Sequence, residues 1–127
     1  MKIILDTNAY VDLCKGNEKA TAVTREAEQI FIPFISLAEL RAGYLCGSKA
    51  AQNERYLARF LSTARVEILF PDEQTTHHYA RLFYQLRKQG TPIPTNDIWI
   101  ASLTMQHNLM LLSGDGHFDN LPQIPRG

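Results

Sequence analysis

The chain has 127 residues, a length suited to one domain with a substantial core, and its 13 basic and 13 acidic side chains give a formal net charge of zero. Bulk charge therefore gives no argument for a polyanionic partner, and no long uncharged apolar stretch predicts a membrane span. The first residues enter an apolar strand directly and do not form a cleavable signal. We expect residues 1–127 to be a single soluble, cytoplasmic domain in which Cys14 and Cys46 are buried thiols.

Strands and helices are expected to alternate along the chain. Apolar runs with little polar alternation predict strands at residues 1–5, 30–35, 66–70 and 109–112, with a short edge strand near Ile124. Helical spacing predicts helices at residues 8–14, 19–28, 36–47, 50–63, 72–88 and 96–107. In the helix at 50–63, Tyr56, Phe60 and Leu61 are expected to face inward. Right-handed crossovers then give a three-layer α/β/α sandwich around a mostly parallel sheet of four to five strands.

Basic side chains gather in the middle of the chain, where Arg55 and Arg59 have the spacing to share one helix face. A solvated helix surface is the commoner reason for such a group. The full group is Arg41, Arg55, Arg59, Arg65, Arg81, Arg87 and Lys88.

Four carboxylates are placed where they can meet at one edge of the predicted sheet. Asp6 ends the first strand, and Asp115 follows the fourth strand. Glu39 lies in the first turn of the helix after the second strand, and Asp97 opens the apolar helix that leads into the fourth strand. Ligands of open α/β sheets bind at the carboxyl ends of the strands, which makes these four acids the candidate site.

Each acid also has a purely structural explanation. Asp6 could cap the next helix, Asp97 could complement a helix dipole, and Asp115 could be a turn residue between two glycines. Ser36 and Glu39 have capping-box spacing, and by spacing alone we prefer that explanation for Glu39. The site hypothesis depends on convergence, because clustered carboxylates raise one another's pKa and need a positive charge nearby.

A metal cation is the natural source of that positive charge. Carboxylates without paired His or Cys favour a hard ion, Mg²⁺ or Mn²⁺, over Zn²⁺. Surface or dipole roles explain His77, His78 and His107, which are expected near helix ends. Hard divalent ions activate water and stabilise charge on phosphoryl groups, which points to phosphodiester hydrolysis.

Four segments together resemble the PIN-domain ribonucleases and, within that family, the VapC-type toxins of bacterial toxin–antitoxin pairs. Their order, spacing and the chain length fit over nearly the whole sequence. The segments are Leu5-Asp6-Thr7-Asn8, Ser36-Leu37-Ala38-Glu39-Leu40 with Gly43, Ile93-Pro94-Thr95-Asn96-Asp97 with Ile100-Ala101, and Ser113-Gly114-Asp115 with His117-Phe118.

The resemblance implies a PIN-like fold and a metal-dependent endoribonuclease. Its acidic pocket would consist of Asp6, Glu39, Asp97 and Asp115 and would bind one or two Mg²⁺ or Mn²⁺ ions. It also implies single-stranded or loop RNA as the substrate, a homodimer, and a small antitoxin that wraps the helices and blocks the pocket.

The resemblance also assigns supporting roles to three residues. Asn8 and Ser113 match polar positions that support the site, and Asp119 could serve as an accessory acid. Gly114 and Gly116 depart from the pattern, since bulkier and often charged residues are common there. This departure bears on the rigidity of the turn.

Other functions stay open at this point. A haloacid-dehalogenase-like phosphatase would use Asp6 as a covalent nucleophile, but it needs a second Asp where this chain has Asn8. A receiver-type signalling module needs a phosphoacceptor after the third strand, where only Asp72 is available, and both alternatives lack a suitably placed lysine. A solitary PIN nuclease in RNA processing and an inactive binding module that keeps the fold are the remaining alternatives.

Overall fold

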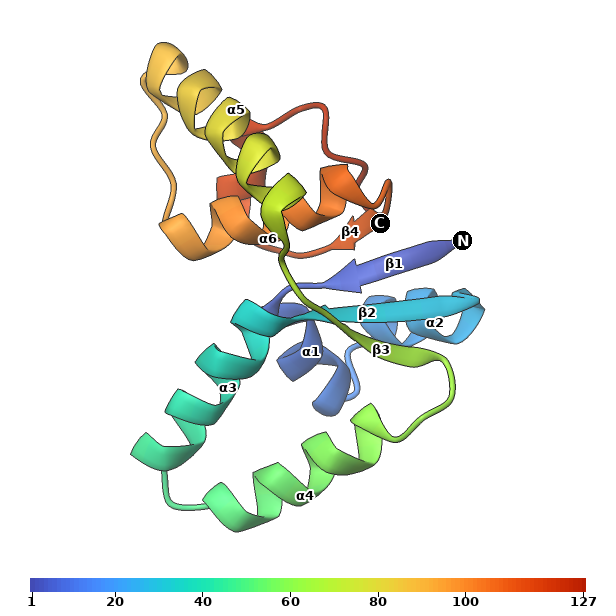
Figure 1. The fold of residues 1–127 in the computed structure, drawn as a ribbon. Coiled ribbons are helices and arrows are strands. Elements are labelled where there is room, and N and C mark those ends of the chain that lie inside the picture. The colour runs from blue at the N-terminus through green and yellow to red at the C-terminus, as the bar shows by residue number, and fades with distance from the viewer.

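A four-stranded parallel sheet forms the centre of the molecule in the computed structural model, which describes residues 1–127 (Figure 1). The strand order is β3-β2-β1-β4, and each neighbouring pair is parallel. The strands are β1 (Lys2–Leu5), β2 (Gln29–Pro33), β3 (Val66–Leu69) and β4 (Met110–Leu112). The helices are α1 (Thr7–Cys14), α2 (Glu18–Glu26), α3 (Phe34–Cys46), α4 (Ala50–Leu61), α5 (Glu73–Gln89) and α6 (Thr95–Gln106), followed by the 3₁₀ helix η1 (Gly116–Asn120).

The residues of β1 alternate between two separate cores. Ile3 and Leu5 pack with α1 to α4, whereas Ile4 packs with α5 and α6 on the other face. Figure 1 shows these two helical layers on opposite sides of the sheet. Since successive side chains of a strand point to opposite faces, an unbroken apolar run is what a doubly covered strand requires. The predicted three-layer α/β/α sandwich is confirmed.

The C-terminal tail does not form the predicted edge strand at Ile124. It contributes a single isolated bridge between Leu111 and Arg126, with hydrogen bonds from Leu111 N–H to Pro125 O and from Gly127 N–H to Leu111 O. Pro122 and Pro125 lack backbone N–H groups, which prevents a longer ladder.

Helix α3 begins two residues earlier than predicted. Pro33 ends β2 and precedes the first helical residue, Phe34, so Ser36 lies inside the helix. Ser36 is fully buried, and its hydroxyl has no hydrogen-bond partner. The fixed φ of proline suits the position before a helix, which explains why the strand stops there.

The inward face of α4 differs from the prediction in one residue. Leu57 is fully buried, whereas Tyr56 is exposed and Phe60 and Leu61 are partly buried. Both cysteines are exposed, contrary to the prediction, because Cys14 and Cys46 are the last residues of α1 and α3, where these helices extend away from the sheet (Figure 1).

The basic group in the middle of the chain lies on the surface, and every one of its seven members is exposed. Arg41 pairs with Glu54 at 3.1 Å between α3 and α4. None of the helices has the length and apolar character that a bilayer span requires.

Candidate metal centre

The carboxyl ends of the strands border a polar cavity of about 310 Å³. Its walls come from the ends of β1 and β4, from α3 and from the start of α6. All four predicted acids line it: Asp6, Glu39, Asp97 and Asp115. Acids that are remote in the sequence therefore do converge at one edge of the sheet.

Asp6 is the most deeply buried acid of the cavity, with 3% of its surface exposed. Its Oδ1 accepts a hydrogen bond from Ala9 N–H at 2.8 Å and so caps α1, while its Oδ2 accepts one from the Ser113 hydroxyl. Burial raises the pKa of Asp6; these hydrogen bonds oppose the increase, and the nearby Asp115 adds to it. Asp6 thus has both roles considered for it, as a helix cap and as a wall of the cavity.

Glu39 is held by a side chain of α1 and does not form a capping box. Because α3 starts at Phe34, Glu39 lies in the second turn, and the predicted exchange with Ser36 does not occur. The Thr7 hydroxyl instead donates a hydrogen bond of 2.6 Å to Glu39 Oε1. The preferred structural explanation of Glu39 is therefore wrong, and the carboxylate is directed toward the cavity mouth.

Asp97 and Asp115 both contact a third group, His117. The Nδ1 of His117 is 3.0 Å from Asp97 Oδ2 and 3.0 Å from Asp115 Oδ1. One ligand atom from each of these residues lies within 4.8 Å of the other two. No other group of three His, Cys, Asp or Glu side chains in the chain is this close.

The charges of this cluster perturb one another. Burial raises the pKa of Asp97, and Asp115 and Glu39 add to the increase, while His117 opposes it. Partial desolvation lowers the pKa of His117, but the attraction of Asp115 and Asp97 outweighs it and leaves that pKa raised. The acids are therefore close enough to disfavour one another's ionisation, which is the condition that a bound cation relieves.

Hydrogen bonds hold the loop after β4 against the cavity. Ser113 donates to Asp6 and accepts from Asp115 N–H at 3.0 Å, so one hydroxyl connects the ends of β1 and β4. Asp115 accepts from His117 N–H at 2.9 Å and caps η1. Phe118 anchors this turn in the core with 1% of its surface exposed. Ser113 is thus placed to support the site.

The other two supporting residues have different positions. Asn8 is exposed and lines the cavity, where it is available to a ligand. Asp119 does not line the cavity; its side chain is 76% exposed and pairs with Arg126 at 3.1 Å. Arg126 also donates to Ser113 O at 2.8 Å. Asp119 therefore pairs with the C-terminal tail outside the cavity, and its role as an accessory acid stays a prediction.

Two residues of this region were not predicted as site residues. His117 was included only as part of a motif, although its position two residues after Asp115, beside a glycine, was a signal for convergence. Thr7 likewise appears in the sequence analysis only as part of a motif, and its contact with Glu39 depends on how α1 and α3 pack. No spacing rule predicts that contact.

The cavity does not suit the alternative chemistries. No lysine lines it, although both phosphoryl-transfer alternatives require one. Asp72, the only candidate phosphoacceptor of a receiver module, instead caps α5 and accepts hydrogen bonds from Thr75 N–H at 3.2 Å and Gln106 Nε2 at 2.8 Å. Carboxylate oxygens and one imidazole nitrogen form a donor set that fits a divalent cation.

Comparisons with known proteins agree with this geometry. The PIN domain family matches residues 3–124. Ribonuclease VapC1 of Haemophilus influenzae strain R2866 is 34% identical over 117 residues, which cover 89% of this chain and 86% of the relative. The crystal structure of VapBC2 from Rickettsia felis bound to a DNA fragment from their promoter matches with a TM-score of 0.86 and 30% identity over 100% of this chain and 98% of the other. The structure of VapBC-1 from nontypeable Haemophilus influenzae matches with a TM-score of 0.85 and 30% identity over 100% and 97% of the two chains. The chain therefore belongs to the PIN-domain family and, within it, to the VapC ribonucleases.

Proposed function

We propose that this chain is a single nuclease domain, residues 1–127, that hydrolyses RNA phosphodiester bonds with a divalent metal ion and acts as the toxin of a toxin–antitoxin pair. The observation that carries the proposal is the convergence of Asp6, Glu39, Asp97 and Asp115 on one cavity. Burial raises the pKa of Asp6 and Asp97 and neighbouring acids add to the increase, which supports a site that gains from a bound cation. A binding module without catalysis has no evident need for such a cluster.

The four acids have distinct roles in this proposal. Asp97 and Asp115, each with a carboxylate oxygen within 4.8 Å of the other's, and the buried Asp6 would hold the ion, Mg²⁺ or Mn²⁺. A bound ion would supply two effects there, a lower pKa of its water and stabilisation of charge on the phosphoryl oxygens. Glu39, fixed by Thr7, orients a water or takes part in holding a second ion. The exposed amide of Asn8 donates a hydrogen bond to a phosphate at the cavity mouth.

The substrate class follows from the form and lining of the cavity. It is open at the surface and lined by acids and amides, with Ile100 as an apolar contact. A phosphate approaching four carboxylates is repelled unless a cation lies between them, so metal and RNA are expected to bind together. Single-stranded or loop RNA is the form whose backbone can enter such a cavity.

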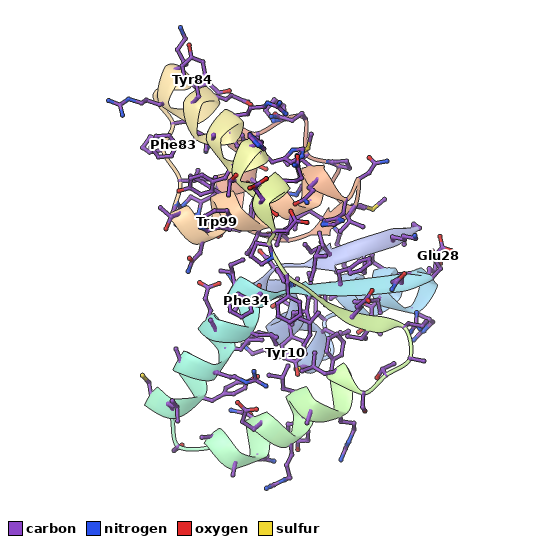
Figure 2. All side chains as sticks on the ribbon, viewed as in Figure 1. Tyr10, Glu28, Phe34, Phe83, Tyr84 and Trp99 are labelled. Atoms are coloured by element: carbon purple, nitrogen blue, oxygen red, sulfur yellow. The ribbon has the colours of Figure 1, made fainter.

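A small antitoxin is the proposed protein partner, in keeping with the VapBC complexes to which the chain is structurally similar. An apolar groove of about 470 Å³ between α1 and α4 gives its side chains a surface to fill. Tyr10, Cys14, Tyr56 and Phe60 are among its lining residues. Phe83 and Tyr84 project outward from α5 and offer apolar area for a homodimer (Figure 2).

RNA cleavage with matched variants tests this proposal. The wild-type chain should cleave RNA in Mg²⁺ or Mn²⁺ and not in EDTA, and Asp97→Asn should lose activity by about 10³-fold or more, roughly 4 kcal/mol of barrier. The control is Glu28→Gln, which also replaces a carboxylate by an amide. Glu28 is exposed and directly precedes β2, at the end of the strand opposite to the cavity (Figure 2). Equal cleavage by wild type and Asp97→Asn, or cleavage that persists in EDTA, would contradict the proposal. Inhibition of the cleavage by a small protein co-expressed with this chain would favour a toxin, and its absence would favour a solitary nuclease.

A further inference from the structure

We infer that His117 is itself a ligand of the metal site and that its imidazole gives the site a preference for divalent transition ions, such as Mn²⁺ and Co²⁺, over Mg²⁺. The inference rests on the proposed metal-dependent function and adds a nitrogen donor to a site otherwise built from carboxylates. Three residues carry it: Asp97, Asp115 and His117.

The distances within the cluster fit one coordination sphere. Nδ1 of His117 lies 3.0 Å from Asp97 Oδ2 and 3.0 Å from Asp115 Oδ1. Ligands at adjacent corners of an octahedron with bonds of about 2.1 Å are about 3.0 Å apart. The imidazole nitrogen therefore already has the separation from both carboxylates that neighbouring ligands of one ion require.

Hydrogen bonds of the turn at residues 115–120 position the imidazole ring of His117. The backbone N–H of His117 donates to Asp115 Oδ1 at 2.9 Å, and Asn120 Nδ2 donates to His117 O at 3.2 Å. The next residue, Phe118, is buried in the core and fixes the turn. The backbone that carries the ring is thus held on both sides of His117.

The second ring nitrogen is free to carry the proton that a ligating Nδ1 must release. Nδ1 makes the protein contacts of the ring, and Nε2 has no protein hydrogen-bond partner, while the side chain is 48% exposed to solvent. Without metal, the contacts of Nδ1 with the two carboxylates require a hydrogen on Nδ1. A metal ion would displace that proton, leave the hydrogen on Nε2 and take the Nδ1 lone pair, which is the form in which His binds metals.

The preference among ions follows from ligand chemistry. Mg²⁺ is hard and retains oxygen ligands and water, so it gains little from an imidazole. Divalent transition ions bind imidazole, and their affinity for such a site rises from Mn²⁺ to Co²⁺. The contribution of His117 should therefore be small for Mg²⁺, larger for Mn²⁺ and largest for Co²⁺.

Metal titration of three forms of the full chain tests this inference without an activity readout. The forms are the wild type, His117→Gln and the control His107→Gln. His107 is exposed at the far end of α6 from Asp97, ten residues and about 15 Å along the helix. Titration calorimetry with MgCl₂, MnCl₂ and CoCl₂ gives the affinities, and pulsed electron paramagnetic resonance of the Mn²⁺ complex detects a coordinated ¹⁴N nucleus. Circular dichroism checks that all three forms have the same fold.

We expect His117→Gln to weaken Mn²⁺ binding by about 10-fold and Co²⁺ binding by up to about 100-fold, with Mg²⁺ binding nearly unchanged. The ¹⁴N signal should appear in the wild type and in His107→Gln and be lost in His117→Gln. A wild-type Mn²⁺ complex without a ¹⁴N signal would overturn the inference, as would equal losses for all three ions. Tighter binding in His117→Gln would also overturn it, because the imidazole would then merely occupy the place of the ion. These results would leave the proposed function intact, whereas absence of binding by all three ions would overturn both.

Discussion

The hydrogen bond from Thr7 to Glu39 makes the position of one site carboxylate depend on a neutral residue. Thr7 is the first residue of α1, and Glu39 belongs to a different helix, α3. The Thr7 hydroxyl donates a hydrogen bond of 2.6 Å to Glu39 Oε1. Thr7→Val keeps the branched shape and removes the hydroxyl. We expect this variant to fold normally and to release Glu39 into several rotamers, because Glu39 is exposed and this is its one side-chain hydrogen bond within the protein.

The size of the effect can be worked out from this contact. A hydrogen bond to a charged group contributes roughly 1.5–3 kcal/mol, and the lower end applies here because the contact is open to solvent. About 1.5 kcal/mol corresponds to about tenfold in rate. Loss of an interaction that orients a metal-site residue costs about 10- to 100-fold, in agreement with this figure.

RNA cleavage at saturating substrate measures the prediction, with Thr7→Ser as the variant that retains the hydroxyl. Thr7→Val should lower kcat by about tenfold with little change in KM, and Thr7→Ser should restore most of the activity. Unchanged cleavage by Thr7→Val would refute the reasoning, because Glu39 would then be either dispensable or positioned by other means. A matching loss in Thr7→Ser would also refute it, since packing and not the hydroxyl would be responsible.

Three other substitutions test other parts of the structure. Asp6→Asn removes a carboxylate whose pKa burial raises. The cost of this charge to folding grows as the pH rises from the ordinary carboxyl pKa through the raised pKa of the folded protein, so thermal unfolding in EDTA should show a gain in stability near neutral pH that fades in acid. Arg126→Ala removes the hydrogen bond to Ser113 O, so amide exchange in residues 113–120 should accelerate while the exposed pair with Asp119 contributes little. Leu57→Ala opens a cavity at a fully buried site and should lower the free energy of unfolding in urea by about 2–5 kcal/mol. For Asp6→Asn, a gain in stability that does not depend on pH would contradict the expectation. For Arg126→Ala, unchanged amide exchange would do so. For Leu57→Ala, it would be a loss of unfolding free energy below about 1 kcal/mol.

The layers of the fold could be predicted because the strands are covered on both faces. An apolar run such as β1 reveals burial on two sides, and Ile3, Ile4 and Leu5 are all fully buried. Errors occurred where a short segment has two compatible conformations. The start of α3 moved by two residues because Pro33 can end a strand and also precede a helix. In α4, adjacent Tyr56 and Leu57 differ by about 100° around the helix, so a small error in phase exchanges their environments.

The convergence of the acids was predictable from topology, and the finer structure of the site was not. Parallel strands place their carboxyl ends at one edge, which brings Asp6 and Asp115 together, and α6, which leads back into β4, begins at the same edge and adds Asp97. The partners of these acids depend on rotamers and on helix packing, which no periodicity encodes. Glu39 was assigned to Ser36 by spacing, but its partner is Thr7, 32 residues away in the chain.

Although the net charge of the chain is zero, the cavity carries an excess of negative charge, and this excess affects both stability and function. The seven basic residues of the central group are all exposed, and neither lysine nor arginine lines the cavity, so four carboxylates face one another with His117 as the nearest group that can be positive. Burial and neighbouring acids raise the pKa of Asp6 and Asp97, so their negative charge lowers the stability of the metal-free protein. The same repulsion is relieved when a cation binds, and an ion present at 100 times its Kd stabilises the folded state by about 2.7 kcal/mol. An arginine in the cavity would offset part of this repulsion and would compete with a metal ion for the carboxylates. The cost to folding and the affinity for the ion are therefore two consequences of one arrangement of charges.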